Sequence, residues 1–394
     1  MSSAAATKSV GFHIQPVQTE SDREAFLSVP WRVYADDPNW VPPLRSEVAK
    51  QFVPENPFLQ YGRLQSFIAL PENPSGRHRA PNKSQPPLGR IVAAVNDRLI
   101  EREQQPIGLF GFFECINDLA IAQALLDAAC QWLREQGMTR ARGPIDLSTH
   151  NNCFFQVEGF GRAPTIMMPY NPPYYPDFME QCGWHKAKDA YAYDFHISQP
   201  LPPIYEKAYR IACRAGITFR PIHTKGEGFQ QDCRNLYKLF TRSFANNWSS
   251  TPRSEEEFME EAKSLQDLVD PDIFPIAEYE GEMVGFFLAL PDYNIALKHV
   301  NGKLNLWGIL KFLWYRRQID QARVIAIAAP EEYRRKMLAP GLVYACWDGN
   351  RRNGSPYKRA DLSWVYEDNK LSRKIIEATG AKIFQTFRIY EKAL

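Results

Sequence analysis

Four neighbouring polar side chains, three of which can accept or donate a proton, follow one apolar strand, which is predicted at 360–365. They are Tyr366, Glu367, Asp368 and Asn369. Ligand sites of α/β proteins form at the carboxyl ends of strands, so Glu367 is a candidate general base or binder of a cation. Tyr366 and Asp368 are further candidates for proton transfer. The alternative is that these polar residues cap a helix predicted at 370–379, a role that suits Asp368 or Asn369.

Another candidate, Glu114, ends the apolar strand predicted at Ile107–Cys115. A carboxylate that points from such a strand into a cleft has a raised pKa, which is typical of functional sites. The alternative is that Glu114 complements the dipole of the helix predicted at Leu119–Gln136. The sequence leaves both interpretations open.

Composition argues against several classes of function. The 394 residues include 47 Lys and Arg against 45 Asp and Glu, so the net charge of +2 gives no bulk attraction for nucleic acid. The 7 cysteines show no CxxC pairing and no HExxH occurs, so we expect reduced thiols and no metal site. No apolar stretch approaches the roughly 20 residues that span a bilayer. These features predict a cytoplasmic protein.

Length and proline-rich segments predict two domains, because 394 residues exceed what one core usually organises. Residues 1–10 are small and polar and are expected to be disordered, and Pro71–Pro87 is expected to form an exposed loop. The segment 198–203 is a predicted linker between an N-terminal domain, 11–197, and a C-terminal domain, 204–394.

Both halves are predicted to alternate strands and helices in a similar order. Strands of the first half are expected at Phe12–Val17, Leu64–Leu70, Gly89–Val95, Ile107–Cys115, Thr139–Leu147 and Trp184–Ile197, and helices at Ser21–Ser28, Leu119–Gln136 and Tyr175–Cys182. Strands of the second half are expected at Ile217–Ile222, Ile273–Glu280, Glu282–Leu290, Arg323–Ala329, Ala360–Val365 and Lys382–Lys392, and helices at Phe229–Asn246, Ser254–Val269, Pro340–Arg352 and Lys370–Thr379.

Three short matches indicate that the halves are diverged copies of one unit. They are Glu180–Gly183 with Glu377–Gly380, Tyr193 with Tyr390, and Asp146-Leu147-Ser148 with Asp361-Leu362-Ser363. Each Tyr stands ten residues after its Gly. The alternative is that Glu-x-x-Gly recurs only because glycine ends helices well.

The order β, α, α, β, β, β, α, β, α, β resembles the Gcn5-related N-acetyltransferase (GNAT) superfamily, and within it a group of bacterial tandem-domain proteins. The residues that carry the closer resemblance are Pro30–Tyr34, Asp37–Leu44, Asn56–Phe58, Gly108–Glu114, Met168–Tyr175, Asn301–Leu304, Leu362–Asn369 and Phe387–Lys392. The resemblance implies an α/β fold with mixed sheets in two tandem GNAT-like domains. It also implies an N-acyltransferase that uses acetyl-CoA or a longer acyl-CoA and a small-molecule amine.

In that superfamily a loop Arg/Gln-x-x-Gly-x-Gly/Ala binds the cofactor phosphates between the fourth strand and the next helix. The corresponding stretch here is Glu332–Ala339, in which Arg335 and Met337 replace the glycines. The implied cofactor-binding residues are Ile327, Ala329, Arg334, Arg335, Lys336, Met337, Leu338 and Ala339. Adjacent basic side chains can hold a pyrophosphate by charge, and the alternative is a degenerate loop with solvated charges. The same place in the first half, Glu114–Ala120, is acidic, so that domain is expected to lack the cofactor.

The superfamily often places a proton-donating Tyr seven residues after an Asn at the end of the fifth strand. Asn369 matches the Asn, but Ile376 stands where the Tyr is expected. The resemblance therefore leaves Tyr366, Glu367 and Asp368 as candidate replacements, and Glu114 remains a separate candidate. The alternative function is a catalytically inactive binding or scaffold protein of this fold.

Residues 304–317 lie where the superfamily usually has a tight hairpin. Leu306, Leu310 and Leu313 have helical spacing, and Arg316 and Arg317 are basic. Three interpretations stay open: an interfacial helix that contacts anionic lipid at the inner membrane face, a wall for a long acyl chain, or a helix packed against the other domain. Either of the first two predicts a lipid-like substrate.

Overall fold

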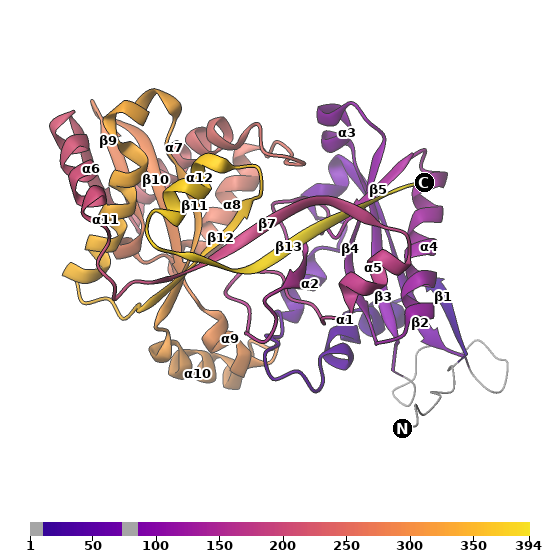
Figure 1. The fold of residues 1–394 in the computed structure, drawn as a ribbon. Coiled ribbons are helices and arrows are strands. Elements are labelled where there is room, and N and C mark those ends of the chain that lie inside the picture. Colours follow the sequence, from indigo (N-terminus) through magenta and orange to yellow (C-terminus); the bar gives the residue numbers. More distant parts are fainter. Residues whose placement is uncertain (1–10, 73–85) are drawn as a thin grey trace, which may run out of the picture. The chain divides into compact units, whose positions relative to one another are not determined.

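The computed structural model describes residues 11–72 and 86–394 (Figure 1). The expected disorder of 1–10 lies outside the described residues, as does most of the loop predicted at 71–87. The chain forms two compact units. Unit 1 holds the described residues up to Phe155, together with Asn171–Ala187 and Ile389–Leu394, and unit 2 holds Gln156–Tyr170 and Lys188–Arg388.

Unit 1 is a mixed sheet with helices on both faces. Its elements are β1 (Phe12–Pro16), α1 (Glu20–Val33), α2 (Arg45–Lys50), β2 (Gly62–Pro71), β3 (Gly89–Asn96), α3 (Asp97–Glu103), β4 (Ile107–Cys115), α4 (Leu119–Glu135), β5 (Arg140–Gly143) and α5 (Tyr175–Gln181). The strands follow the order β1-β2-β3-β4-β5, and β4 and β5 are parallel. Gly89 lies so close to Leu125 of α4 that a Cβ there would clash, whereas the next residue, Arg90, lies over Phe26 of α1. Because successive strand residues face opposite sides, α4 and α1 cover opposite faces.

Unit 2 repeats this plan with additional helices. Its elements are β6 (Phe155–Glu158), β7 (His185–His196), α6 (Pro203–Arg214), β8 (Ile217–Pro221), α7 (Gly226–Phe244), α8 (Glu255–Leu265), β9 (Pro275–Tyr279), β10 (Glu282–Pro291), α9 (Asn294–Val300), α10 (Leu306–Tyr315), β11 (Gln321–Ala328), the 3₁₀ helix η5 (Glu331–Lys336), α11 (Leu338–Arg352), β12 (Arg359–Tyr366), α12 (Lys370–Glu377) and β13 (Lys382–Ala393). The strand order is β7-β12-β11-β10-β9-β8, in which β11 and β12 pair in parallel and the other neighbours are antiparallel.

The alternation of side chains along β9 and β10 builds two cores in unit 2. Ala277 and Phe287 belong to the core that includes residues of α6 and α11. Their neighbours Ile276 and Phe286 belong to the core on the other face, with Leu236 of α7. The sheet of unit 2 is therefore buried on both sides, which explains its nearly continuous apolar strands.

The strands β7 and β13 run from one unit into the other, and Figure 1 shows both as long strands. Tyr193 of β7 lies opposite Leu362 of β12, and Tyr390 of β13 lies opposite Gly143 of β5. Because β7 and β13 each begin two residues after the glycine that follows their helix, Tyr193 and Tyr390 are equivalent positions. Gly143 is therefore the counterpart of Leu362.

This register corrects one of the predicted matches between the halves. Asp361 precedes Leu362, so its counterpart is Arg142 and not Asp146. Asp146 lies beyond the strand, because β5 ends at Gly143 instead of Leu147 as predicted. The N–H of Asp146 donates to the carbonyl of Asn152 at 2.8 Å, which holds the residue in a turn outside the sheet.

Sequence patterns miss α2, α3, α6, α9 and β6. Helix α6 begins at Pro203, inside the proline-rich segment 198–203 that is expected to be a linker. Proline is tolerated there because the N–H groups of a first turn have no partner within the helix. The division of the two repeats at 198–203 stays a prediction, since the compact units exchange segments and do not follow a single cut in the chain.

Candidate active site

The parallel strands β11 and β12 pair along only part of their length. Their register runs from Gln321 opposite Arg359 to Val324 opposite Leu362 and ends there. A bulge follows Val324 in the pairing of β11 with β10, and Tyr366 at the end of β12 pairs with Ala190 of β7. The last part of β11, Ile325–Ala328, thus has no strand pairing to β12 in the described chain.

We call this opening the β11–β12 wedge, bounded by Ile325–Ala328 and Ser363–Tyr366. Residues 324–327 are partly exposed although β11 is flanked by strands on both sides, and so are Trp364 and Val365 of β12. A strand in the middle of a covered sheet is normally buried, as β4 is in unit 1. The residues along the wedge are therefore less completely buried than most residues of β4.

The same place in unit 1 is closed by the chain itself. The N–H of Ile145 donates to the carbonyl of Phe110 at 2.7 Å, and the N–H of Phe112 donates to Oδ1 of Asp146 at 2.6 Å. A Cβ at Gly111 would lie 2.5 Å from the carbonyl oxygen of Ile145. Burial raises the pKa of Asp146 to about 6. In unit 1, the backbone of Ile145 and the carboxylate of Asp146 thus occupy the position that corresponds to the β11–β12 wedge of unit 2.

Beyond β11, the chain forms η5 and enters α11 without a side-chain cap. Met337 adopts the left-handed conformation with φ of 56° and serves as the N-cap. Pro340 has no N–H, so the first turn presents the N–H groups of Leu338 and Ala339. These groups and the helix dipole favour an anion at this end of α11.

The three basic residues of η5, Arg334, Arg335 and Lys336, differ from one another in their contacts. Arg334 forms an exposed ion pair with Glu331 at 2.9 Å, and the Lys336 ammonium lies 3.2 Å from the ring centroid of Tyr279. Arg335 is exposed. Exposed ion pairs contribute little free energy, so these side chains can turn toward an anion at low cost.

The polar residues after β12 have mainly structural contacts. Asn369 caps α12, because its Oδ1 accepts from the N–H of Ser372 at 3.1 Å. Oδ2 of Asp368 pairs with Nζ of Lys188 at 2.6 Å, which lowers the pKa of Asp368. Oε1 of Glu367 accepts from the N–H of Asp189 at 3.2 Å. Asn369 thus takes the cap role that the sequence left open, whereas Glu367 keeps a partly exposed carboxylate held by β7.

Tyr366 ends β12 within an aromatic cluster formed by Trp248, Trp364 and Tyr366. Its ring lies 4.9 Å from Trp364 and 6.1 Å from Trp248, between centroids, and its hydroxyl donates to the carbonyl of Trp248 at 3.2 Å. The Lys188 ammonium lies 5.7 Å from the rings of both Trp248 and Tyr366. Ile376, at the usual position of the superfamily's tyrosine, is buried in the core of unit 2.

Sequence reasoning did not identify Trp248 or Lys188. Trp248 lies in the connector between α7 and α8, which carries no periodic pattern. The available signal was a tryptophan among polar residues in Asn246-Asn247-Trp248-Ser249-Ser250, since a loop rarely places so large a ring without a partner.

Glu114 belongs to unit 1, and its partly buried side chain lies among tyrosines. The hydroxyl of Tyr175 donates to its Oε2 at 2.9 Å, and Arg90 lies opposite it on β3. Burial raises the pKa of Glu114 to about 7, although Arg90 and the hydroxyls of Tyr175 and Tyr34 act in the other direction. The pKa of Tyr34 is in turn raised well above its ordinary value, chiefly by burial. The structure thus places Glu114 in the unit whose wedge is closed.

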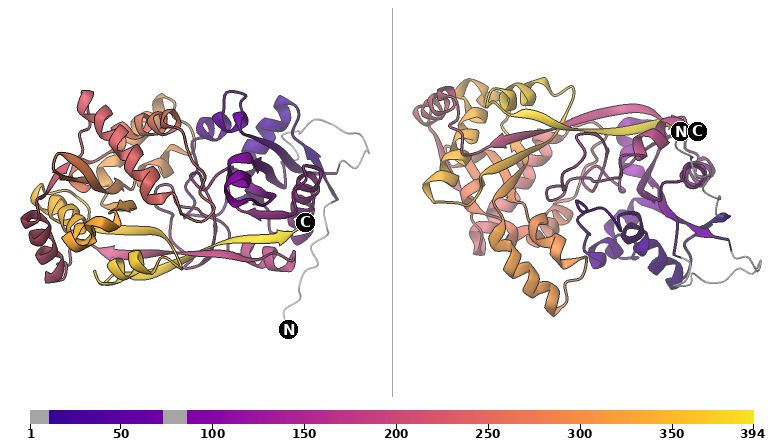
Figure 2. Two further views of the ribbon diagram at one scale, coloured as in Figure 1. Left: turned by 90° about the horizontal axis from the view of Figure 1, so that it is seen from above. Right: turned by 60° about the horizontal axis from the view of Figure 1, so that its bottom comes forward.

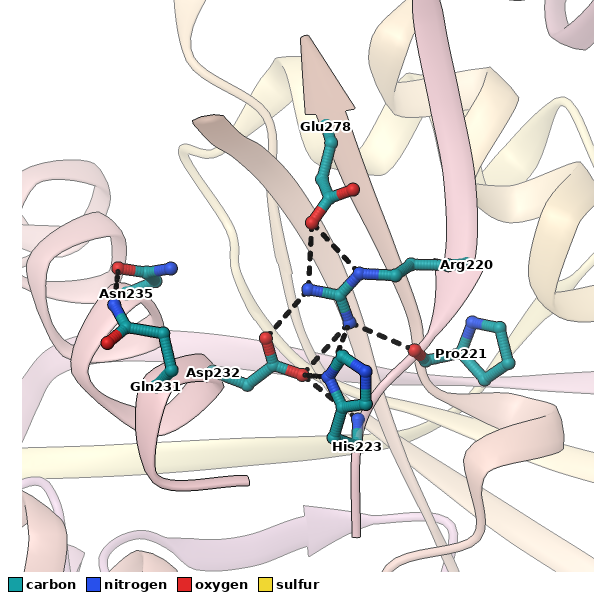
Figure 3. Close-up of polar contacts among 7 residues, drawn as sticks. All are labelled: Arg220, Pro221, His223, Gln231, Asp232, Asn235 and Glu278. Carbon is teal, nitrogen blue, oxygen red and sulfur yellow. Dashed lines mark hydrogen bonds and ion pairs between the residues drawn. The ribbon is translucent and has the colours of Figure 1, made fainter. Parts of the chain in front are cut away.

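A histidine–aspartate pair in unit 2 has a geometry that general bases often show (Figure 3). Nδ1 of His223 lies 2.9 Å from Oδ2 of Asp232. The guanidinium of Arg220, however, donates to both oxygens of Asp232 at 2.9 and 2.7 Å and also binds Glu278. Burial opposes ionisation of Asp232, but these hydrogen bonds outweigh it and lower its pKa. The cluster joins β8, α7 and β9, so we interpret it as a clamp for α7.

The described residues contain no group of three His, Cys, Asp or Glu side chains placed to hold a metal ion. The same part of the chain contains no helix long and apolar enough to cross a membrane.

Two proteins are similar to this chain over nearly its whole length. The bacterial ceramide synthase of Caulobacter vibrioides is 31% identical over 388 residues, which cover 96% of this chain and 97% of that protein. Protein YghO of Escherichia coli is 29% identical over 387 residues, covering 95% and 94%. This chain belongs to the family of the bacterial ceramide synthase. No family model matches the chain.

Solved structures of GNAT proteins share the fold. A tandem GNAT protein from the clavulanic acid biosynthesis pathway superposes with a TM-score of 0.54 and 12% identity, covering 97% of this chain and 98% of that one. A GCN5-related N-acetyltransferase from Sphaerobacter thermophilus gives a TM-score of 0.51 and 13% identity over 97% and 95%. The predicted α/β fold of two tandem GNAT-like domains is confirmed.

We predict that Glu114→Gln flattens the pH dependence of stability. A carboxyl whose pKa is raised on folding binds more protons in the folded state, so its contribution is fully present below the unfolded pKa and is lost as the pH rises through about 7. Thermal midpoints measured from pH 5 to 8 should fall less steeply in the variant than in the wild type. Glu101→Gln, at an exposed position of α3, is the control and should follow the wild type. Parallel curves for Glu114→Gln and the wild type would contradict this account.

We predict that Asp232→Asn destabilises unit 2 by about 2 kcal/mol, because the partly buried guanidinium of Arg220 loses the charged partner that accepts two of its hydrogen bonds. Because the folded pKa of Asp232 is lowered, its stabilisation is present above the unfolded pKa, near 4, and is lost as the pH falls through the folded value. Urea unfolding followed by far-ultraviolet circular dichroism measures the change at pH 7 and pH 3. Gln231→Ala, one residue earlier and exposed, should have little effect. Equal stability of the two variants at pH 7 would refute the clamp.

Proposed function

We propose that this protein is an N-acyltransferase that moves an acyl group from acyl-CoA to the amine of a long-chain amino alcohol, so that the product is a ceramide-like amide. The single observation that carries the proposal is the open β11–β12 wedge beside an uncapped helix. The membership in the ceramide synthase family supports the long-chain acceptor and an N-acyl bond.

The residues around the wedge fit an acyl-CoA molecule. The backbone of Ile325–Ala328 can pair with the amides of an extended pantetheine arm as a missing strand would. Leu338 and Ala339 offer N–H groups for the pyrophosphate, and Arg335 and Lys336 supply positive charge. The sequence-derived residues Ile327, Ala329, Arg334 and Met337 line the path from β11 to α11. Acyl-CoA supplies the activated thioester.

Amide formation needs a neutral amine and a proton donor for the leaving thiolate. The amine nitrogen forms a bond to the acyl carbon while the bond from that carbon to sulfur breaks, and the nitrogen loses one proton. We assign the acceptance of that proton to Glu367, whose carboxylate is held by the N–H of Asp189. We assign donation to the thiolate to Tyr366, because its bond to Trp248 is long for an O–H donor and an anionic sulfur can replace that acceptor.

The test is an assay with palmitoyl-CoA and a long-chain amino alcohol, read as released thiol and as amide by mass spectrometry. We expect amide formation, and Tyr366→Phe should lower kcat by about a hundredfold with a similar KM for palmitoyl-CoA. Arg335→Glu should mainly raise that KM, by about tenfold. Tyr237→Phe removes a hydroxyl that donates to a backbone carbonyl at 3.1 Å elsewhere in unit 2, and it should keep full activity.

Calorimetric titration separates the alternatives. Folded protein that binds neither acetyl-CoA nor palmitoyl-CoA and forms no amide would overturn the proposed function in favour of a scaffold protein. Binding without turnover would retain the wedge as a site and reject the catalytic assignment.

A further inference from the structure

Helix α10 exposes its apolar residues to solvent, which is the reverse of an ordinary surface helix. Leu306 is 71% exposed, Trp307 is 72% exposed and Trp314 is 64% exposed. Leu310 and Leu313 are exposed as well. These five residues, which we call the α10 apolar face, recur with helical spacing and form one broad stripe.

The opposite side of α10 is fixed to the preceding helix. Gly308 is buried, and the ring of Phe312 stacks on Tyr293 with centroids 5.9 Å apart. The ring of Tyr315 stacks on His299 of α9 at 3.5 Å. These contacts determine which side of α10 faces outward, and Figure 2 shows the two helices (orange) projecting from unit 2.

The base of this helix pair is anchored by a buried carboxylate. Asp292, which is 1% exposed, accepts from the N–H groups of Ile166 at 2.8 Å and Asn294 at 3.1 Å. Its other oxygen accepts from the side-chain amide of Gln321 at 2.6 Å. Asp292 thus joins the end of β10 to the start of β11, so the helix pair is held to the sheet at both of its ends.

The charged residues of the segment that contains α9 and α10 are all basic. The segment 293–319 contains no Asp or Glu. It contains the basic residues Lys298, Lys303, Lys311, Arg316 and Arg317. An exposed apolar stripe with tryptophans and a basic rim is the pattern of helices that lie in the headgroup region of anionic bilayers.

We propose that α10 docks unit 2 on an anionic phospholipid surface, with the α10 apolar face inserted at the boundary between headgroups and acyl chains. The basic residues beside the α10 apolar face favour a lipid surface over a second copy of this chain. In a two-fold dimer through this face, each rim would meet an identical rim, which is repulsive, whereas lipid phosphates neutralise it. The inference rests on α10 alone and does not require the proposed acyl transfer, although membrane docking would bring a lipid-like substrate within reach.

Vesicle flotation of the full-length chain tests the docking. Vesicles of phosphatidylcholine with 30 mol% phosphatidylglycerol should carry the wild type upward, and vesicles of phosphatidylcholine alone should carry about tenfold less. Trp307→Ser/Trp314→Ser should lower the partition coefficient by about tenfold or more. The matched control is Ile204→Ser/Leu371→Ser, which removes two exposed apolar residues from α6 and α12 and should bind as the wild type does.

A second pair of variants tests the charges. Arg316→Glu/Arg317→Glu should reduce binding to the anionic vesicles by about tenfold, and Arg214→Glu/Lys225→Glu, at exposed positions elsewhere in unit 2, should not. Equal flotation of the tryptophan variant and its control would overturn the proposal. So would concentration-dependent dimerisation by sedimentation that disappears in Trp307→Ser/Trp314→Ser, because a second copy would then cover the face.

Discussion

The central constraint in this molecule is that every backbone N–H and C=O inside a sheet needs a partner. β11 and β12 pair with each other only from Gln321 and Arg359 as far as Val324 and Leu362, whereas β12 pairs with β7 from Arg359 to Tyr366. To pair with Ile325–Ala328 on this side, a ligand or another segment of the chain would need an extended row of hydrogen-bond donors and acceptors. The proposed recognition of a pantetheine arm follows directly from this unfinished pairing.

Unit 1 shows what happens when the chain completes the pairing itself. The residues after β5 turn back, and Asp146 takes the N–H of Phe112, which has φ of 48° at the bulge of β4. Two copies of one architecture thus differ in whether the wedge is filled. In unit 1 the strand β4 ends near the partly buried Glu114, whose pKa is raised, whereas in unit 2 the strand β12 ends in aromatic and charged residues.

Strong periodicity made much of the fold predictable. β4 is observed at the predicted residues, and α4 ends one residue early, because an unbroken apolar strand and an i, i+4 pattern capped by Asp118 leave few alternatives. Local chemistry also predicted a polar cap before α12, but not which residue provides it. The choice of Asn369 depends on Asp368 being bound by Lys188, which is 180 residues away in the chain.

The state of the wedge could not be predicted from the sequence. It depends on contacts between distant residues, such as Phe112 with Asp146 in unit 1 and the end of β12 with β7 in unit 2. The match of Asp146-Leu147-Ser148 with Asp361-Leu362-Ser363 even suggested the wrong alignment of the two halves. The first segment lies in a turn after β5, whereas the second lies within β12. The replacement of the loop glycines by Arg335 and Met337 could be read from the sequence. That α11 begins without a side-chain cap could not, because it depends on the left-handed backbone conformation of Met337.

Hydrogen–deuterium exchange with and without palmitoyl-CoA tests the central claim most directly. The account predicts slower exchange of the amides in Ile325–Ala328 and in the first turn of α11, with no change in β4 or at 143–147 of unit 1. Protection confined to β4 and its neighbours, with β11 unchanged, would show that the open wedge is not where acyl-CoA binds.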